Sequence, residues 1–338
     1  MALRNRVNRE ELKLRIQADK RPYTTLSFYC YHPITDTLSF RNDLYSMFSQ
    51  IEVIGRIYVA FEGINAQIAM PTVYLAAFKK ALYSIKFLDG IRLNTAIDSA
   101  FQSFYKLDIK VRNKIVADGI EDPTFSLQNR GTYLDARAWN KMMQIPETIV
   151  IDMRNHYESE VGRFEGAICP DTDTFREELA RIVDVYKQEK DKQILMYCTG
   201  GIRCEKASAW MKHNGYKKVF HLEGGIINYV NQVKKQGLDN KFKGVNFVFD
   251  QRICERSTDD VIANCCQCGV PADSHINCAN TACHILFIQC AACAILFEKC
   301  CSQDCKSVIQ LSSSQQKELR KGKPLEKKFS KGRFPSNV

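Results

Sequence analysis

The segment from Cys198 to Arg203 combines residue types that together can activate a thiol. It reads Cys-Thr-Gly-Gly-Ile-Arg, after an apolar run ending in Tyr197 and before a helical pattern. Glycines let backbone N–H groups point inward as an anion-binding nest, and a helix N-terminus adds positive potential. Because this environment and the charge of Arg203 lower a thiol pKa, we predict that Cys198 is a catalytic thiolate and that Arg203 supports it. The loop residues predicted to surround the substrate or anion are Thr199, Gly200, Gly201 and Ile202.

The spacing in this segment argues against two other cysteine chemistries. Tyrosine phosphatases place one more residue between Cys and Arg than the four that separate Cys198 from Arg203, so this ring suits a group smaller than phosphate. A thioredoxin-type site needs Cys-x-x-Cys, but the next cysteine is Cys204, six positions on. Cys204 is predicted either to pack in the first helical turn or to act as a resolving partner for Cys198.

A second pair of charged residues, Asp152 and Arg154, stands at the end of another short apolar run. We expect the two to form an ion pair that supports the loop, in a structural rather than a catalytic role. His221, Gly224 and Gly225 follow a third apolar run. We expect His221 to be a core or surface histidine, and the glycines to permit close packing beside the pocket.

Cysteine pairs after residue 254 have the spacing of metal ligands. Eleven of the fifteen cysteines lie between Cys254 and Cys305. Four close pairs can supply two four-thiolate sites, with the first pair joined to the third and the second to the fourth, and zinc suits such sites. His275 and His284 are alternative ligands, and a metal-free cysteine domain or an iron–sulfur cluster are the competing interpretations. The predicted ligands are Cys265, Cys268, Cys278, Cys283, Cys290, Cys293, Cys301 and Cys305.

The elements that must position these residues fall into three parts. Residues 20–117 alternate in the order βαββαβ, which predicts a ferredoxin-like or acylphosphatase-like module whose last strand lies within 104–116. Residues 117–131 are rich in Gly, Pro, Asp and Asn and predict a linker. Residues 130–238 alternate short apolar strands with helices, which predicts an α/β domain with a mostly parallel sheet, and a strand at 193–197 leads directly into Cys198. A Cys-rich module at 242–310 follows.

The remaining segment, 311–338, is a basic tail. Between Lys317 and Arg333 it has eight Lys or Arg against two Glu, so we expect little fixed structure there. The whole chain carries a formal charge of +10, which favours a polyanionic partner or simply keeps the protein in solution. The N-terminus has no apolar h-region, and the longest apolar run, 285–297, is too short to cross a bilayer. We therefore expect a cytoplasmic protein with no membrane contact.

Three motifs in the α/β part together resemble the rhodanese fold. They are IDMRNHYESEVGRFEGAICP, MYCTGGIRCEK and HLEGGIINY, in this order. With FEGINAQIA in the N-terminal module and the Cys-rich C-terminus, the chain resembles more narrowly the bacterial tRNA uridine 5-hydroxylase family over about residues 20–305. The resemblance implies a rhodanese-like domain and an oxidoreductase that hydroxylates the wobble uridine of tRNA to 5-hydroxyuridine, with molecular oxygen as co-substrate. No dinucleotide-binding Gly-rich fingerprint is visible in the sequence.

Two other functions remain open at this point. A sulfurtransferase would carry a persulfide on Cys198, because a persulfide is also an anion suited to the loop. A non-catalytic RNA-binding scaffold is the second alternative, which an intact Cys198 and Arg203 disfavour. In the N-terminal module we expect most aromatic side chains among the candidate RNA contacts to lie in the core and Glu62–Asn65 to form a turn, although the resemblance draws attention to Asn65. Candidate RNA contacts are Tyr29, Tyr31, Arg56, Tyr58, Phe61, Lys79 and Lys80.

Overall fold

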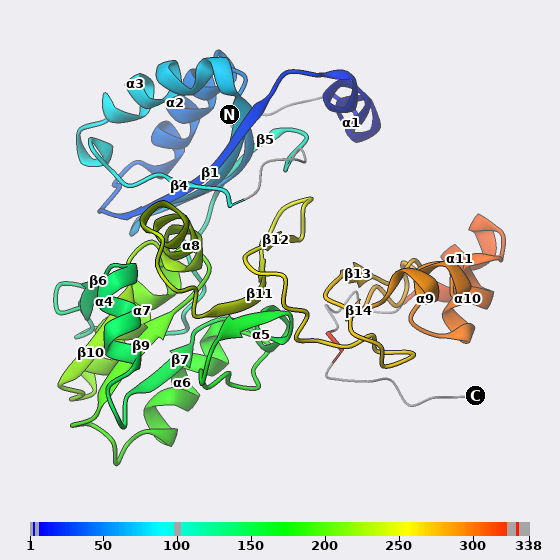
Figure 1. Ribbon diagram of the computed structural model, residues 1–338. Coiled ribbons are helices and arrows are strands. Elements are labelled where there is room, and N and C mark those ends of the chain that lie inside the picture. The colour runs from blue at the N-terminus through cyan, green and yellow to red at the C-terminus, as the bar shows by residue number, and fades with distance from the viewer. Residues whose placement is uncertain (1–2, 4–6, 98–102, 323–328, 331–338) are drawn as a thin grey trace.

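The computed structural model describes residues 3, 7–97, 103–322 and 329–330, and it divides into three parts (Figure 1). The N-terminal module lies over the rhodanese-like domain, with helix α8 and strand β12 next to its sheet. The Cys-rich module extends to one side of the rhodanese-like domain. Among the described residues, no helix is long and apolar enough to span a membrane.

The N-terminal module is a ferredoxin-like sheet with one added strand. Its strands lie in the order β4-β1-β3-β2-β5, and the first four reproduce the predicted βαββαβ topology. Helices α2 and α3 cover one face, where Leu44, Phe48, Phe78 and Leu82 enter the core. The elements are α1 (Arg9–Ala18), β1 (Tyr23–Tyr31), α2 (Thr37–Ser49), β2 (Ile54–Ala60), β3 (Gly63–Pro71), η1 (Thr72–Tyr74), α3 (Leu75–Tyr83), η2 (Lys86–Leu88), β4 (Asn94–Thr95) and β5 (Leu107–Val111).

One strand of this sheet differs from the sequence-based expectation. The extended run in 104–116 was expected to complete the βαββαβ order, but it forms β5, which pairs in parallel with β2 at the far edge. The strand that completes the order is β4, which pairs with β1 through Leu26 and Ser27. Because β4 has two residues, it is too short to show the alternation by which strands are recognised.

The rhodanese-like domain has a parallel sheet in the order β6-β10-β9-β7, as the alternating pattern predicted. Its central strand β9 ends at Tyr197, so the Cys198 loop begins at the carboxyl edge of the sheet, where open α/β folds place their ligands. The elements are β6 (Thr132–Leu134), α4 (Ala136–Met143), β7 (Ile149–Asp152), α5 (His156–Glu160), β8 (Gly162–Phe164), α6 (Phe175–Val185), β9 (Gln193–Tyr197), α7 (Ile202–His213), β10 (Lys218–Leu222) and α8 (Gly225–Gln236).

The C-terminal part begins as a sheet on the rhodanese-like domain and continues as the Cys-rich module. Strand β11 pairs with β8 on one side and β12 on the other. The described elements are β11 (Phe242–Phe247), β12 (Cys254–Arg256), β13 (His275–Asn277), β14 (Leu286–Ile288), α9 (Ala291–Leu296), α10 (Gln303–Ile309) and α11 (Ser313–Arg320).

The expectation of little fixed structure in the basic tail is wrong for its first part. Helix α11 includes the basic residues Lys317 and Arg320, and a capping box of Ser312 and Gln315 satisfies its first N–H groups. Phe329 stacks on Tyr157 with ring centroids 4.2 Å apart. Residues 323–328 and 331–338, which carry five of the eight basic residues between Lys317 and Arg333, lie outside the described residues.

A buried ion-pair cluster fixes the N-terminal module to the rhodanese-like domain. Lys206 on α7 is 2% exposed and donates to Glu62 Oε2 of the β2–β3 turn at 2.6 Å. It also donates to Asp118, which is 1% exposed and lies in the predicted linker. The linker residues 117–131 form no helix or strand, but Asp118 ties them to both parts.

Candidate functional site

Cys198 lies at the base of a loop whose donors point at its sulfur. Its side chain is 1% exposed, and the Gly201 N–H donates to Sγ at 3.2 Å. Gly201 has a φ of 101°, which a residue with a side chain adopts only under strain. A Cβ there would also lie 3.0 Å from the Tyr29 hydroxyl. The second glycine of the loop is therefore required by the conformation that aims its N–H at Cys198.

The surroundings of Cys198 favour its thiolate. Burial alone would raise the pKa of Cys198, but the Cys204 thiol hydrogen-bonds to it, Arg203 attracts its charge, and the N–H groups of Cys204 and Gly201 donate to it. The net effect lowers the pKa of Cys198 from 9.0 to about 6. Cys204 itself packs, fully buried, in the first turn of α7 and is a free thiol. Packing of Cys204 is thus observed, while a resolving role stays a prediction.

Arg203 is held by an acidic partner that the sequence analysis missed. Its guanidinium donates to both Glu158 oxygens, at 2.6 and 2.9 Å, and to the Thr199 hydroxyl at 3.3 Å. Glu158 is fully buried on α5, where its side chain also accepts from the Asn155 N–H in a capping box. Asn155-x-x-Glu158 is a recognisable helix-start signal, but it does not reveal a contact with a loop far along the chain.

The start of helix α8 supports the Cys198 loop from the other side. The N–H groups of Ile226 and Ile227 donate to the carbonyls of Cys198 and Thr199 at 3.0 and 3.2 Å. A Cβ at Gly225 would lie 2.5 Å from the Cys198 oxygen. The predicted close packing at this glycine is therefore confirmed. His221 lies in the core, fully buried, as one of the two expected alternatives.

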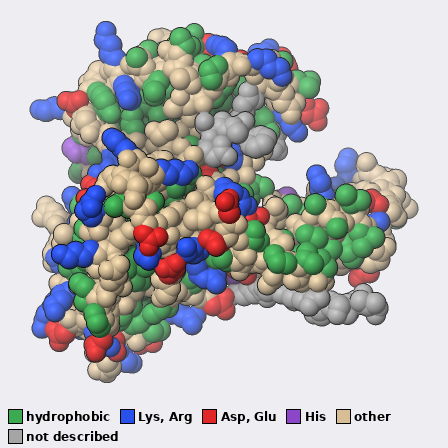
Figure 2. All heavy atoms as spheres, in the orientation of Figure 1, with side chains coloured by type: hydrophobic (Ala, Val, Ile, Leu, Met, Phe, Trp, Pro, Cys, Tyr) green, Lys and Arg blue, Asp and Glu red, His purple; other side chains and the backbone are tan. Residues whose placement is uncertain are grey.

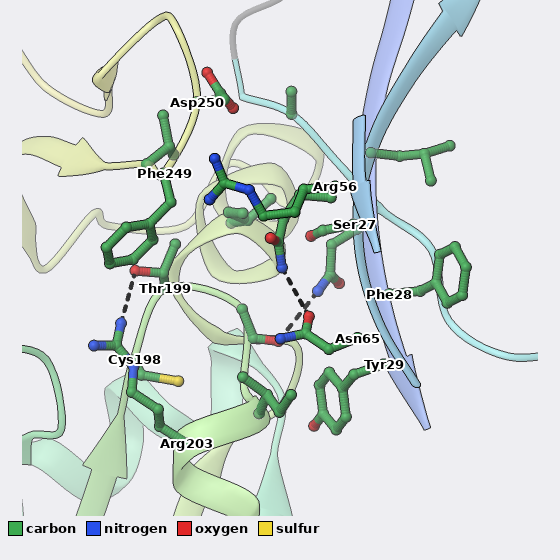
Figure 3. Close-up of a pocket in the computed structure, with 18 of the residues that line it drawn as sticks. Ser27, Phe28, Tyr29, Arg56, Asn65, Cys198, Thr199, Arg203, Phe249 and Asp250 are labelled. Carbon is green, nitrogen blue, oxygen red and sulfur yellow. Dashed lines mark hydrogen bonds between the residues drawn. The ribbon is translucent and has the colours of Figure 1, made fainter. Parts of the chain in front are cut away.

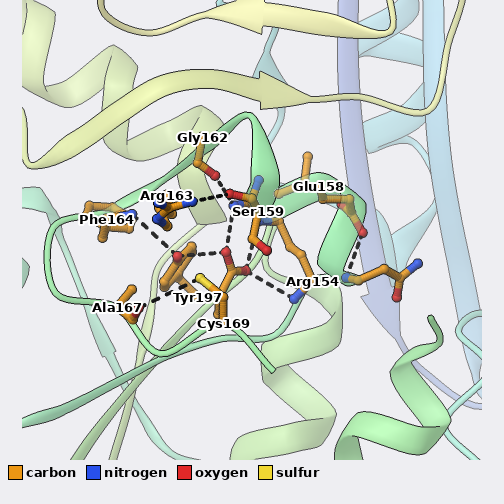
Figure 4. Close-up of polar contacts among 12 residues, drawn as sticks. Arg154, Glu158, Ser159, Gly162, Arg163, Phe164, Ala167, Cys169 and Tyr197 are labelled. Atoms are coloured by element: carbon orange, nitrogen blue, oxygen red, sulfur yellow. Dashed lines mark hydrogen bonds and ion pairs between the residues drawn. The ribbon is translucent and has the colours of Figure 1, made fainter. Parts of the chain in front are cut away.

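Asp152 and Arg154 form the expected ion pair, and both are fully buried (Figure 4). The Arg154 guanidinium donates to the Asp152 oxygens at 2.8 and 2.6 Å and to the Gly162 carbonyl at 2.6 Å. The Tyr197 hydroxyl donates to Asp152 at 2.7 Å. The pair therefore holds the residue directly before Cys198 and takes no part in lining the cavity described next.

A cavity of about 390 Å³ lies between the Cys198 loop and the N-terminal sheet (Figure 3). Cys198, Thr199 and Arg203 lie on one side of it, and the sheet residues Ser27, Arg56 and Asn65 lie on the other. The loop after β11, with Phe249 and Asp250, forms a third wall. The volume suits a small organic group such as a nucleobase.

The proposed RNA contacts of the N-terminal module divide between this cavity and the outer surface. Tyr29, Arg56 and Tyr58 line the cavity, together with Asn65 on β3. Tyr29 and Tyr31 donate to α7, at Glu205 Oε2 (2.9 Å) and the Ile202 carbonyl (3.1 Å). The expectation that most of these aromatics enter the core is wrong, because this sheet face meets a second domain.

The other candidate contacts lie away from the cavity. Phe61 is 63% exposed, and Lys79 and Lys80 belong to helix α3 on the opposite face of the sheet. Asn65 lies within strand β3 rather than in the expected turn, which is confined to residues 61–62. Sequence reasoning missed Gln67, Asn94 and Phe249 as cavity residues, because only the tertiary fold brings them to Cys198.

The eight paired cysteines form two groups that could each hold a metal ion. The first and third pairs combine as Cys265, Cys268, Cys290 and Cys293, and the second and fourth as Cys278, Cys283, Cys301 and Cys305. Within each group the sulfur atoms all lie within 4.8 Å of one another, and three pairs are 3.6 to 3.7 Å apart. A tetrahedral ion with Zn–S bonds of about 2.3 Å has sulfur atoms about 3.8 Å apart, so the geometry fits zinc. His275 and His284 belong to neither group.

Comparisons with known proteins place each part of the chain. A family model described as UPF0176 acylphosphatase like domain matches residues 23–115, one described as Rhodanese-like domain matches 135–232, and one described as Rhodanase C-terminal matches 243–306. The chain is thus confirmed to contain an acylphosphatase-like module, a rhodanese-like domain and a Cys-rich C-terminal region.

Curated relatives match nearly the whole chain. A tRNA uridine(34) hydroxylase of Photorhabdus laumondii is 53% identical over 95% of this chain and 92% of its own length. The protein of the same name from Cronobacter sakazakii is 52% identical over 99% of this chain and 97% of its own, and that from Yersinia pestis is 54% identical over 95% and 91%. The chain therefore belongs to the tRNA uridine(34) hydroxylase family.

Proposed function

We propose that this chain is a cytoplasmic oxidoreductase that hydroxylates the wobble uridine of tRNA to 5-hydroxyuridine, with molecular oxygen as co-substrate. The observation that carries the proposal is a thiolate, Cys198, with a pKa of about 6 at the wall of a cavity whose opposite wall bears amide side chains. The names of its curated relatives agree with this reaction. The wobble base lies in a single-stranded loop, so it can enter a cavity at little cost in unpairing.

Cys198 can supply the reactivity that uracil lacks towards oxidation. Addition of the thiolate to the uracil 6-carbon makes the 5-carbon an enolate carbon, which is electron-rich. One atom of molecular oxygen stays on that carbon as a hydroxyl, and the other leaves as water with two electrons and two protons from an external two-electron donor. Loss of the proton on the 5-carbon and release of Cys198 then restore the ring double bond. In the competing route, oxygen first oxidises Cys198 to a sulfenate while the same donor reduces the second oxygen atom to water, and the sulfenate then delivers its oxygen to the 5-carbon and returns to the thiol. Arg203 is bound to Glu158, so its role in either route is to fix the loop and attract the thiolate charge.

The nucleosides of tRNA distinguish the proposed reaction from its alternatives. In a strain that lacks the gene, 5-hydroxyuridine should disappear from tRNA hydrolysates measured by mass spectrometry, and the full-length protein should restore it. Cys198→Ser should not restore it, because serine stays protonated in the same loop. Loss of a thiolated base instead would identify a sulfurtransferase, and full restoration by Cys198→Ser would leave a non-catalytic role for the loop.

The addition route predicts a covalent complex. An anticodon stem-loop with 5-fluorouridine at the wobble position should form an adduct with Cys198 that survives a denaturing gel. The fluorine blocks the proton loss that would otherwise release the thiolate. Cys198→Ser is the matched control and should give no adduct. If the wild-type protein hydroxylates the normal stem-loop but traps no fluorinated one, the sulfenate route is favoured.

We propose that zinc occupies both cysteine groups and acts structurally. Thiolate ligands without an open position hold zinc as a fold-stabilising ion, and the small Cys-rich module has few other means of stabilisation. Its core consists largely of the cysteines themselves with Phe287 and Ile288. Zinc at these sites would cross-link segments far apart in the module and take no part at Cys198.

A further inference from the structure

The sheet wall of the cavity is a row of polar side chains in register. Strand pairing places Asn94 opposite Ser27, Ser27 opposite Gln67, and Gln67 opposite Arg56. All four residues line the cavity, as does Cys198 on the other side. The opposite face of the same sheet is apolar and covered by helices. A polar row is therefore directed at the space where the substrate would lie.

A chain of hydrogen bonds fixes the orientation of the Gln67 amide. The Ile115 carbonyl can only accept, and the Asn65 Nδ2 group donates to it at 3.2 Å. Asn65 Oδ1 is therefore directed towards Gln67 and accepts from Gln67 Nε2 at 2.7 Å. The remaining atom, Gln67 Oε1, receives no hydrogen bond from any residue that the structure describes. The carbonyl of Ile115 thus leaves Oε1 as the Gln67 amide atom without a partner among the described residues, on a side chain that lines the cavity.

The cross-strand neighbour of Gln67 presents donors. Arg56 extends from the sheet into the cavity towards the Phe249–Asp250 loop (Figure 3). Its guanidinium forms no ion pair or hydrogen bond with another described residue. An acceptor and a cationic donor therefore come from paired positions on neighbouring strands of one wall, and a ligand edge that complements them has a donor next to an acceptor.

Uracil has this edge and cytosine has its inverse. The uracil N3–H donates, and the adjacent O4 accepts; in cytosine N3 accepts and the adjacent N4 amino group donates. When the polar groups of a site match one base, the other base leaves them without partners or places donor against donor and acceptor against acceptor. This difference discriminates strongly between the two bases. Extruded bases are commonly identified through this Watson–Crick edge.

We propose that Gln67 Oε1 accepts the N3–H of the target uracil, that Arg56 donates to its neighbouring carbonyl, and that Asn65 sets the polarity of Gln67. This assignment rests on the proposed function, because it names the residues that select uridine over cytidine at the same site. Asn65 is a positioning residue, since it acts on the base through Gln67.

Binding of two stem-loops that differ in one base tests the assignment. Affinities of the full-length protein, in a Cys198→Ser background that prevents turnover, are measured for anticodon stem-loops with U or C at the wobble position. Protein with native Gln67 and Asn65 should bind the U stem-loop about tenfold or more tightly than the C stem-loop. Gln67→Met, which keeps the side-chain length but removes the amide, should bring the ratio close to one. Gln50→Met, at an exposed glutamine after α2, is the matched control and should leave the ratio unchanged.

A second variant separates the polarity argument from simple loss of a contact. Asn65→Leu keeps Gln67 but frees its amide to rotate, so this variant should gain affinity for the C stem-loop as it loses preference for U. A stem-loop with N3-methyluridine should bind more weakly than the uridine stem-loop when Gln67 is present. In Gln67→Met the affinities for these two stem-loops should be similar. The pKa of Cys198, measured in the same single variants with the thiol present, should stay at about 6 if the loop is intact.

The outcomes distinguish this inference from the proposed function. Two outcomes overturn the assignment of Gln67 while the function stands, provided that the protein forms 5-hydroxyuridine. In the first, Gln67→Met retains the U preference; in the second, protein with native Gln67 shows no U preference. If the protein forms no 5-hydroxyuridine in any tRNA, the function fails whatever the ratio. Should Gln67→Met not fold, Asn65→Leu and the N3-methyluridine stem-loop decide in the same way.

Discussion

The Cys198 sulfur is almost fully buried, so hydrogen-bond donors of the protein, rather than water, stabilise the negative charge of its thiolate. Three groups stabilise this charge: the Gly201 N–H, the Cys204 thiol, and the Arg203 side chain, which is paired with Glu158. Arg203 could not serve alone, since an unpaired guanidinium at 8% exposure would be costly. Glu158 is therefore part of the support for the nucleophile, although it is acidic and lies beside a thiolate.

The pH dependence of Cys198 alkylation should report its lowered pKa. Because the thiolate is the reactive form, the iodoacetamide rate should rise with pH and reach half its plateau near pH 6, where an ordinary thiol is still protonated. Mass spectrometry of the Cys198 peptide isolates this rate from that of the other cysteines. A midpoint near 9 would contradict the proposed electrostatics.

The control for this titration removes both charges of the ion pair together. Arg203→Met with Glu158→Gln leaves no unpaired buried charge, so the fold should tolerate it better than Arg203→Ala alone. The attraction of Arg203 for the thiolate is lost, and the midpoint should move upward from about 6 towards the ordinary value of 9.0. An unchanged midpoint would show that the backbone N–H groups and Cys204 suffice.

Local sequence predicted the nucleophile and its loop but not their partners. Cys198, the two glycines and Arg203 occur together in six residues, so their joint chemistry is visible without a fold. Glu158 and Gln67 are ordinary residues of a helix start and a strand, and they become site residues only through contacts 45 positions away and across a domain boundary. Such contacts depend on tertiary packing, which no local pattern encodes.

At the scale of elements, regular periodicity decided what could be foreseen. Strand β9 was predicted at 193–197, where the structure has it, and the helix expected after Arg203 is α7, which begins one residue before it, at Ile202. Strand β4 has two residues and no pattern, and the start of α11 depends on a capping box inside a basic, polar segment. The interleaving of the cysteine pairs was expected from their order along the chain, and the two groups combine the first pair with the third and the second with the fourth.

Zinc analysis of single-cysteine variants tests the two groups separately. Protein purified without chelator should contain two zinc ions per chain, one for each group. Cys268→Ala should lose the ion of the first group, and Cys305→Ala that of the second, because three thiolates hold zinc more weakly than four. Cys254→Ala, outside both groups, is the control and should keep both ions. Absence of zinc together with rapid alkylation of all these cysteines in the folded protein would support a metal-free module.

At the scale of the molecule, the cavity exists only because two domains are held together. One wall belongs to the N-terminal sheet and the other to the rhodanese-like domain and the β11–β12 loop. On the face shown in Figure 2, Lys and Arg side chains are spread over both parts and mixed with acidic ones. The net charge of +10 favours a polyanion such as tRNA, and the N-terminal module, with 12 Lys or Arg against 7 Asp or Glu in residues 20–117, carries more of the excess than the rhodanese-like domain, with 17 against 15 in residues 130–238.

Lys206 is the residue whose loss should separate the two domains. It is 2% exposed and bridges Glu62 of the N-terminal module to Asp118 of the connecting segment. Lys206→Met leaves the buried Asp118 with Lys114 as its remaining ion-pair partner, so the loss of unfolding free energy should lie at or below the lower end of the about 3–5 kcal/mol that breaking a buried pair costs. The U preference in stem-loop binding should fall as well, since Gln67 and Cys198 would no longer share one cavity. Lys212→Met, at a half-buried position of the same helix where the ammonium donates to the Arg130 carbonyl, should change stability by about 1 kcal/mol or less. Denaturant unfolding of both variants measures the difference, and equal stability of the two would show that the ion-pair cluster does not hold the domains.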